Sequence, residues 1–177
     1  MNDLGSKFDH LLKDDDVLCA GTIEVKTIST PGHIPACTSY LIGEMVFVGD
    51  VIFMPDSGTG RCDFPKGSAK DLYHSIQKKV YPLPDDTIVF TGHDYQPNGR
   101  DLLFESRIGD QKKENVFLPL ETTEKEFVEN RAKRDKTLGA PKLLLPSIQV
   151  NMNAGVLPVP EENGASYLKI PLTITNV

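Results

Sequence analysis

The strongest constraint on this chain is a motif that occurs three times: an apolar or alternating run, then glycine, then a histidine or aspartate. It appears as TPGH at residues 30–33, VFVGD at 46–50 and IVFTGHD at 88–94. Short apolar runs bounded by glycine predict strands, and glycine lets the backbone turn sharply beside a bound group. The residues of metal-ligand type that follow these runs are His33, Asp50 and His93. The sequence therefore predicts three such side chains at the ends of strands.

The remaining pattern alternates strands with helices and predicts a layered α/β domain. Strands are predicted at residues 17–20, 22–28, 38–42, 45–48 and 87–90, with a hairpin turn at Gly43-Glu44. The run 45–48 has no polar member, which is typical of a strand covered on both faces. Helices are predicted from Ser68 to Pro82, over 104–113, and over 123–138 with Thr123 and Glu126 as a capping box. Residues 167–172 are predicted to form a short strand or an ordered tail.

Composition excludes some functions. The 177 residues carry a net charge of -6 without a Lys/Arg cluster, which argues against a nucleic-acid or anionic-membrane partner. The polar start and the lack of a long apolar run predict neither a signal peptide nor a membrane span. Three cysteines cannot all pair within the chain, so we expect reduced thiols and a cytoplasmic location. Of these, Cys19 and Cys37 are predicted to be buried. Cys62 lies in a glycine-rich loop, and the sequence does not decide whether its side chain is buried or exposed.

A metal site is one of two interpretations of the three ligand-type residues. Imidazole and carboxylate ligands suit zinc and non-haem iron, and two histidines with one carboxylate leave positions open for a substrate or O₂. The alternative is that each residue is an ordinary turn, surface or helix-capping residue. Spacing alone does not separate the two, because His33, Asp50 and His93 lie far apart in the sequence.

Four longer segments resemble a known family. They are TPGHIPACTSYLIG, VFVGDVIFMPDSGTGRCDFPKGSAKDLYHSI, FTGHDYQPNGR and LPSIQVNMNAGVLP. This pattern resembles the persulfide dioxygenases of the metallo-β-lactamase fold, and more closely their bacterial β-lactamase-hydrolase-like branch. The resemblance runs from about residue 8 almost to the end, and GTGRCDFP is its most discriminating part.

The resemblance implies roles for six residues. His33 and Asp50 would be metal ligands, and His93 would correspond to the second-metal histidine of the related hydrolases. Arg61 and Tyr95 would line the thiol-substrate pocket, and Asp94 would be a support residue. No residue is assigned a catalytic role with certainty. The implied cofactor is one Fe(II) per chain, with zinc as the alternative, and the implied reaction oxidises glutathione persulfide, or a similar low-molecular-weight thiol persulfide, to sulfite and the thiol.

One motif of the family is absent from this sequence. The resemblance implies an H-x-H-x-D-H ligand loop after an early strand, whereas the chain has only KFDH at residues 7–10. We therefore expect residues 1–177 to be a single partial domain, the C-terminal portion of an αββα sandwich without its first strands. The sandwich portion is predicted to cover about residues 1–104, followed by a helical C-terminal extension over 105–177. Such a chain would expose an apolar face, hold no metal stably and be inactive by itself.

Three origins of this pattern stay open: a truncated gene or mis-called start, a split protein completed by an N-terminal partner fragment, and a non-enzymatic interaction module. A homo-oligomer is a further partner hypothesis. Within the enzyme class, the alternative is a dinuclear zinc thioester hydrolase of the glyoxalase II type. The GTGRCDFP segment favours the dioxygenase over the hydrolase.

Overall fold

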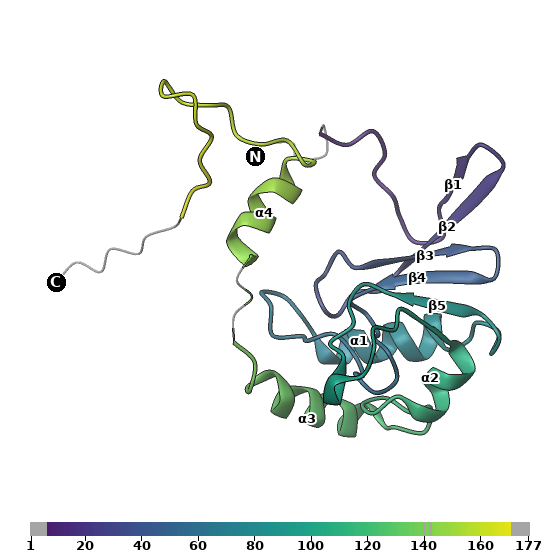
Figure 1. Cartoon of the computed structure of the whole chain (residues 1–177). Helices are drawn as coiled ribbons and strands as arrows, with labels where there is room; N and C mark the ends of the chain where they lie inside the picture. Colours follow the sequence, from purple (N-terminus) through teal and green to yellow (C-terminus); the bar gives the residue numbers. More distant parts are fainter. Residues whose placement is uncertain (1–6, 140, 142, 171–177) are drawn as a thin grey trace. The chain divides into compact units, whose positions relative to one another are not determined.

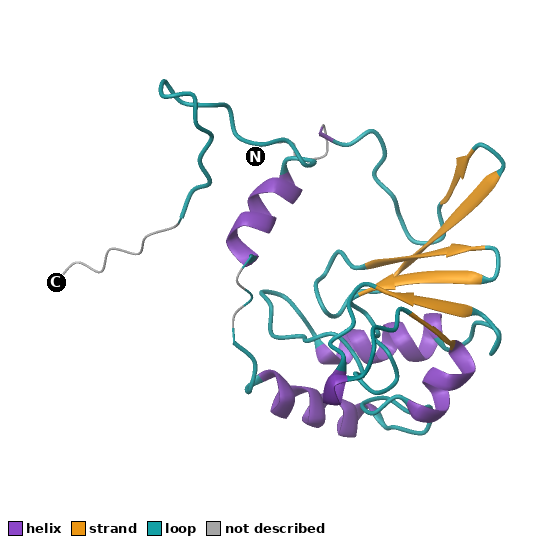
Figure 2. Cartoon of the chain, viewed as in Figure 1, coloured by secondary structure: helices purple, strands orange, loops and turns teal. Residues whose placement is uncertain are grey.

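Six strands form one mixed sheet in which their order along the sequence is also their order in space (Figures 1 and 2). All neighbouring strands are antiparallel except β4 and β5, which are parallel. The strands are β1 Val17–Ala20, β2 Ile23–Ser29, β3 Thr38–Ile42, β4 Met45–Gly49, β5 Ile88–Thr91 and β6 Glu105–Arg107. This computed structural model describes residues 7–139, 141 and 143–170. The α/β class, the five predicted strands and the hairpin at Gly43 are confirmed.

Three helical segments lie on one side of the sheet (Figure 2). They are α1 Ala69–Ser75 with its π-helical continuation η2 Ile76–Val80, α2 Ile108–Glu114 and α3 Glu124–Asp135. Ser68 caps α1, because its side chain accepts a hydrogen bond from the Asp71 N–H. Thr123 and Glu126 form the predicted capping box of α3. The loop after β5 adds a short 3₁₀ turn, η3 Pro97–Gly99.

The predicted helix over residues 104–113 is wrong in its first part. Glu105–Arg107 is strand β6, antiparallel to β5, and α2 begins only at Ile108. The polar sequence of β6 carries no period-two apolar signal, so local pattern could not reveal it. The backbone of β5 offers partners at the sheet edge, and this pairing decides the conformation of residues 105–107.

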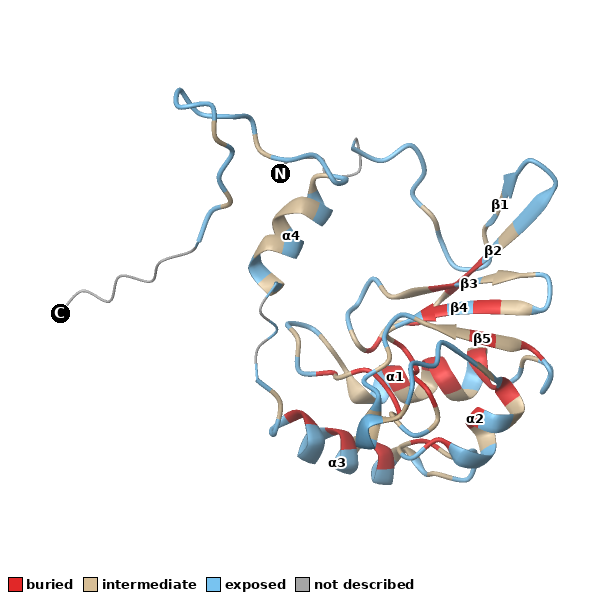
Figure 3. Cartoon of the chain, viewed as in Figure 1, coloured by how far each residue is buried: buried red, intermediate tan, exposed pale blue. Residues whose placement is uncertain are grey.

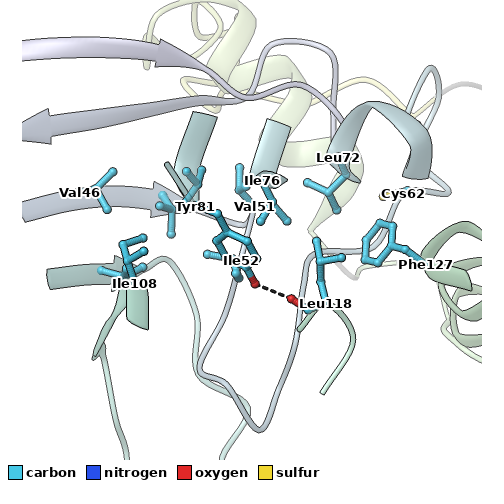
Figure 4. Close-up of a cluster of buried hydrophobic side chains, with 13 residues drawn as sticks. Val46, Val51, Ile52, Cys62, Leu72, Ile76, Tyr81, Ile108, Leu118 and Phe127 are labelled. Atoms are coloured by element: carbon cyan, nitrogen blue, oxygen red, sulfur yellow. Dashed lines mark hydrogen bonds between the residues drawn. The ribbon is translucent and has the colours of Figure 1, made fainter. Parts of the chain in front are cut away.

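The strand register separates two faces of the sheet. Leu41, Val46 and Val89 are paired across neighbouring strands and point toward the helices. Together with side chains from the helices and loops they form the core, part of which is shown in Figure 4. Tyr81 lies inside this core, where its hydroxyl donates to the carbonyl oxygen of Leu118 at 2.5 Å, and burial raises the pKa of that phenol.

The opposite face of the sheet carries an aromatic patch at its centre, and Figure 3 shows exposed and half-buried residues in these strands. Tyr40, Phe47 and Phe90 are paired across β3, β4 and β5 on this face, and Phe47 is 39% exposed. The Phe47 and Phe90 rings stack with centroids 4.9 Å apart, and the Phe104 ring continues the stack. The prediction that the run 45–48 is covered on both faces is therefore wrong, because only the face carrying Val46 and Val48 is buried.

The chain divides into two units, residues 12–138 and the combination of residues 1–11 with 139–177. The second unit contains α4 Leu144–Met152, which has no buried residue. Residues 167–170, part of a predicted strand or tail, form no helix or strand, and residues 171 and 172 lie outside the described residues. The predicted division near residue 104 stays a prediction. In the part of the chain that the structure describes, no helix is both long and apolar enough to cross a membrane.

We predict that Phe47→Lys reduces self-association of the purified chain, because it places a charge in the middle of the aromatic patch. Sedimentation velocity over a range of concentrations measures this. Val116→Lys is the matched control, since Val116 is 58% exposed in the loop after α2. An equal change in both variants, or none in Phe47→Lys, would contradict the role of this face.

Candidate metal centre

His33 is presented by the loop between β2 and β3. Its Nδ1 lies 2.6 Å from the carbonyl oxygen of Arg61. A carbonyl oxygen only accepts, so Nδ1 is the donor, and in a neutral imidazole Nε2 is then the nitrogen with a free lone pair. That Nε2 lies 3.6 Å from Oδ2 of Asp50. The hydrogen bond thus fixes the ring orientation and the tautomer that a metal-binding histidine needs.

The backbone before His33 can take its path only with glycine. Gly32 has a φ of +147°, and a Cβ there would overlap the backbone of Leu72 in α1. The Ser75 hydroxyl of α1 also donates to the carbonyl oxygen of Pro31 at 2.7 Å. Helix α1 therefore holds the His33 loop against the sheet.

Asp50 and His93 meet because β4 and β5 are parallel, so both strands end at the same edge of the sheet. Oδ1 of Asp50 lies 2.5 Å from Nδ1 of His93. A Cβ on Gly92 would lie 2.9 Å from the same Oδ1, so glycine permits this close approach. The Asp50 carboxylate therefore faces His33 with one oxygen and His93 with the other.

The three predicted ligands are thus brought together, with the carboxylate between the two imidazoles. Imidazole nitrogen and carboxylate oxygen are donors of the kind that iron and zinc accept. Yet no group of three or more His, Cys, Asp or Glu side chains within the described residues could hold a metal ion. The donor atoms present are therefore of the kind that a metal site uses, but there are too few of them to hold a metal ion. The role of these residues as ligands stays a prediction.

Arg61 and Tyr95, the predicted substrate residues, border this cluster. The Arg61 guanidinium pairs with Asp63, with Nε 2.6 Å from Oδ1, and lies 5.1 Å from the centroid of Phe64. This pairing lowers the pKa of the Asp63 carboxyl. Tyr95 is 66% exposed, and its ring stacks on His93 with centroids 6.1 Å apart. Partial burial and the Asp50 charge raise the pKa of Tyr95, while the Arg61 charge acts in the opposite direction.

Asp94, the predicted support residue, is withdrawn from solvent and holds the loop after β5. It forms a two-pronged ion pair with Arg100, at 2.6 and 2.7 Å, and accepts the Leu103 N–H. The same guanidinium binds Asp56. Arg100 lowers the pKa of both carboxyls. The sequence reading missed Arg100 and Asp56, because their pairing joins loops 44 residues apart.

Sequence reading also missed two charged residues of α3, Arg131 and Asp135. They form a buried pair with Nη2 2.8 Å from Oδ1. One sequence signal could have identified them: with Phe127 they follow a spacing of four residues, which places them on the buried stripe of the helix. A charged pair on such a stripe needs buried polar partners.

Burial of the cysteines differs from the prediction in two places. Cys19 lies in the edge strand β1 and is exposed, so its predicted burial is wrong. Cys37 is half-buried. Cys62, whose burial the sequence did not decide, is buried, and desolvation raises the pKa of its thiol to about 12.

With this geometry established, the chain can be compared with known proteins. Residues 6–93 match the family described as Metallo-beta-lactamase superfamily. The crystal structure of ETHE1 from Myxococcus xanthus superposes with a TM-score of 0.73 at 32% identity, covering 82% of this chain and 60% of that one. The sheet with its helices is thus a metallo-β-lactamase fold, and the chain belongs to the metallo-β-lactamase superfamily.

Curated relatives carry more than one functional name. The chain is 51% identical to a probable metallo-hydrolase of Burkholderia pseudomallei, over 95% of this chain and 60% of the relative. It is 52% identical to glyoxylase B2 of Dictyostelium discoideum, over 95% of this chain and 58% of the relative. It is 37% identical to human mitochondrial persulfide dioxygenase ETHE1, over 51% of this chain and 36% of the relative. The chain thus spans less than two thirds of each of these proteins.

We predict that Gly60→Ala destabilises the larger unit by about 1–3 kcal/mol, as overpacking does. A Cβ there would overlap the carbonyl oxygen of Asp50 and approach Nδ1 of His33 to 3.2 Å. Urea unfolding measures the change. Gly139→Ala is the control, because a Cβ at Gly139 meets nothing within 4 Å, and we expect a change within about 0.5 kcal/mol. Equal stability of the two variants would contradict the tight fit at Gly60.

We predict that iodoacetamide modifies Cys19 in the native chain at pH 8 and leaves Cys62 unmodified. The thiolate is the reacting form, and a thiol whose pKa is raised to about 12 stays protonated at that pH. Reaction at Cys62 should become faster only as the pH rises toward 12. Peptide mass spectrometry measures both sites, and unfolded chain is the control in which all three thiols react. Similar native rates at Cys19 and Cys62 would contradict the burial of Cys62.

Proposed function

We propose that this chain provides one side of an iron-dependent persulfide dioxygenase site. The observation that carries the proposal is the contact of the GTGRCDFP loop with His33 through the Arg61 carbonyl. This loop is the segment that sets the dioxygenases apart from the general hydrolases in the family resemblance. The structural likeness to a bacterial ETHE1 adds support.

In this proposal His33 Nε2 and Asp50 Oδ2 are the two donors that the chain offers to one iron. Fe(II) would supply the positions at which the persulfide sulfur and O₂ are brought together. Arg61 and Tyr95 would line the approach of glutathione persulfide or a similar thiol persulfide. Asp94, held by Arg100, would keep the loop bearing His93 and Tyr95 in place.

Two donors are fewer than a stable metal site normally uses. We propose that the further histidines come from a polypeptide segment that carries H-x-H-x-D-H, the motif absent from this sequence. Such a segment could also cover the apolar face around Phe47 and Phe90. A cytoplasmic location is part of the proposal and agrees with three cysteines outside disulfides.

A second candidate is a dinuclear zinc thioester hydrolase. The observation in its favour is the Asp50 carboxylate, which faces His33 with Oδ2 and His93 with Oδ1, as a carboxylate bridging two metals would. The names of two relatives, probable metallo-hydrolase and glyoxylase B2, agree with this candidate.

We predict that the chain forms sulfite from glutathione persulfide only when it is combined with a polypeptide carrying H-x-H-x-D-H and loaded with Fe(II) without oxygen. Sulfite and O₂ consumption are the measurements. His33→Asn should lower the rate by more than about 100-fold, because a lost ligand costs more than a lost outer-shell partner. His10→Asn is the matched control, since His10 is exposed in the polar N-terminal segment.

His93→Asn separates the two candidates. A dioxygenase with one iron keeps its metal content and most of its activity in this variant. A dinuclear hydrolase loses its second zinc and the hydrolysis of S-lactoylglutathione. Neither sulfite nor hydrolysis in the combined protein would contradict both enzymes and favour a non-enzymatic interaction module.

A further inference from the structure

The Arg131–Asp135 pair of α3 is buried but has partners beyond the helix. The exposed fractions of the two side chains are 3% and 8%. A buried ion pair contributes little net stability unless its remaining donors and acceptors are satisfied. Here the additional partners are backbone groups of one loop, and that loop also contacts His33.

Two hydrogen bonds connect the pair to this loop. Arg131 Nη1 donates to the carbonyl oxygen of Thr59 at 3.0 Å. The Cys62 N–H donates to Oδ2 of Asp135 at 2.9 Å. These two points flank Gly60 and Arg61, so the pair fixes the backbone on both sides of them.

The fixed segment is the one that orients His33. The Arg61 carbonyl oxygen accepts the His33 Nδ1 proton at 2.6 Å. Gly60 packs so closely on Asp50 that a Cβ would overlap the Asp50 carbonyl oxygen. The position of the Arg61 carbonyl is therefore set by helix α3 on one side and by the end of β4 on the other.

We propose that Arg131 and Asp135 are positioning residues that select the His33 tautomer through the backbone of residues 59–62. The pair keeps the Arg61 carbonyl aimed at Nδ1, which leaves Nε2 unprotonated and directed at Asp50. The proposal takes from the proposed function only that His33 Nε2 is a metal donor. It holds equally for iron and for zinc.

The test measures the tautomer in the chain without metal. Long-range ¹H–¹⁵N correlation of the His33 ring at pH 8.5 should show Nε2 as the unprotonated nitrogen in the wild type. In Asp135→Asn and in Arg131→Lys, the Nε2 ¹⁵N shift should move toward that of a protonated nitrogen, as the Arg61 carbonyl loses its fixed position. Phe127→Leu is the matched control, because Phe127 is buried in α3 and belongs to the same core cluster as Cys62, but its ring offers no hydrogen bond to the loop backbone. It should lower stability without moving the His33 shift.

An unchanged His33 shift in both Asp135→Asn and Arg131→Lys would overturn the proposal. An equal shift in Phe127→Leu would also overturn it, because general loosening of α3 would then suffice. The wild type gives an independent check: the Cys62 amide should exchange with solvent as slowly as amides inside α3. Fast exchange at Cys62 would overturn the proposal without any variant. Since no readout involves metal or activity, failure here differs from failure of the proposed function.

Discussion

The parallel pairing of β4 with β5 is the constraint on which the candidate site depends. Parallel neighbours need a long crossover, and this one runs from residue 50 to residue 87. The crossover contains the GTGRCDFP loop and the helix α1, which covers one face of the sheet. One topological choice therefore places Asp50 beside His93 and also supplies the segment that orients His33.

Sequence alone predicts the parts of the fold that local pattern controls. The apolar runs identify the strands at 38–42 and 45–48, and the capping residues Ser68 and Thr123 mark the starts of two helices. Strand β6 could not be predicted, because its conformation comes from pairing with β5 rather than from its own polar residues. The same holds for Phe47, whose exposure depends on what lies across the sheet and not on the composition of its strand.

The candidate site, like the fold, could be predicted from the sequence only in part. The histidines and Asp50 are visible in the sequence because glycine precedes each of them at the end of a run. The contacts that hold these residues in place are not visible in the sequence. Arg100 pairs with both Asp94 and Asp56, and Arg131 of α3 donates a hydrogen bond to Thr59, 72 residues earlier in the chain. Long-range pairing of charged groups has no local signature, and only the charged residues on the buried stripe of α3 give a hint of it.

The double ion pair of Arg100 has a consequence for how the loop after β5 can move. The single guanidinium of Arg100 forms ion pairs with Asp94 and Asp56. It therefore joins the loop that carries Tyr95 to the segment just after Phe53. The edge-to-face contact of the Phe53 and Tyr95 rings adds a second link between the same two segments. A displacement of Tyr95 would therefore also displace the segment that contains Phe53 and Asp56, so this loop cannot move independently of that segment.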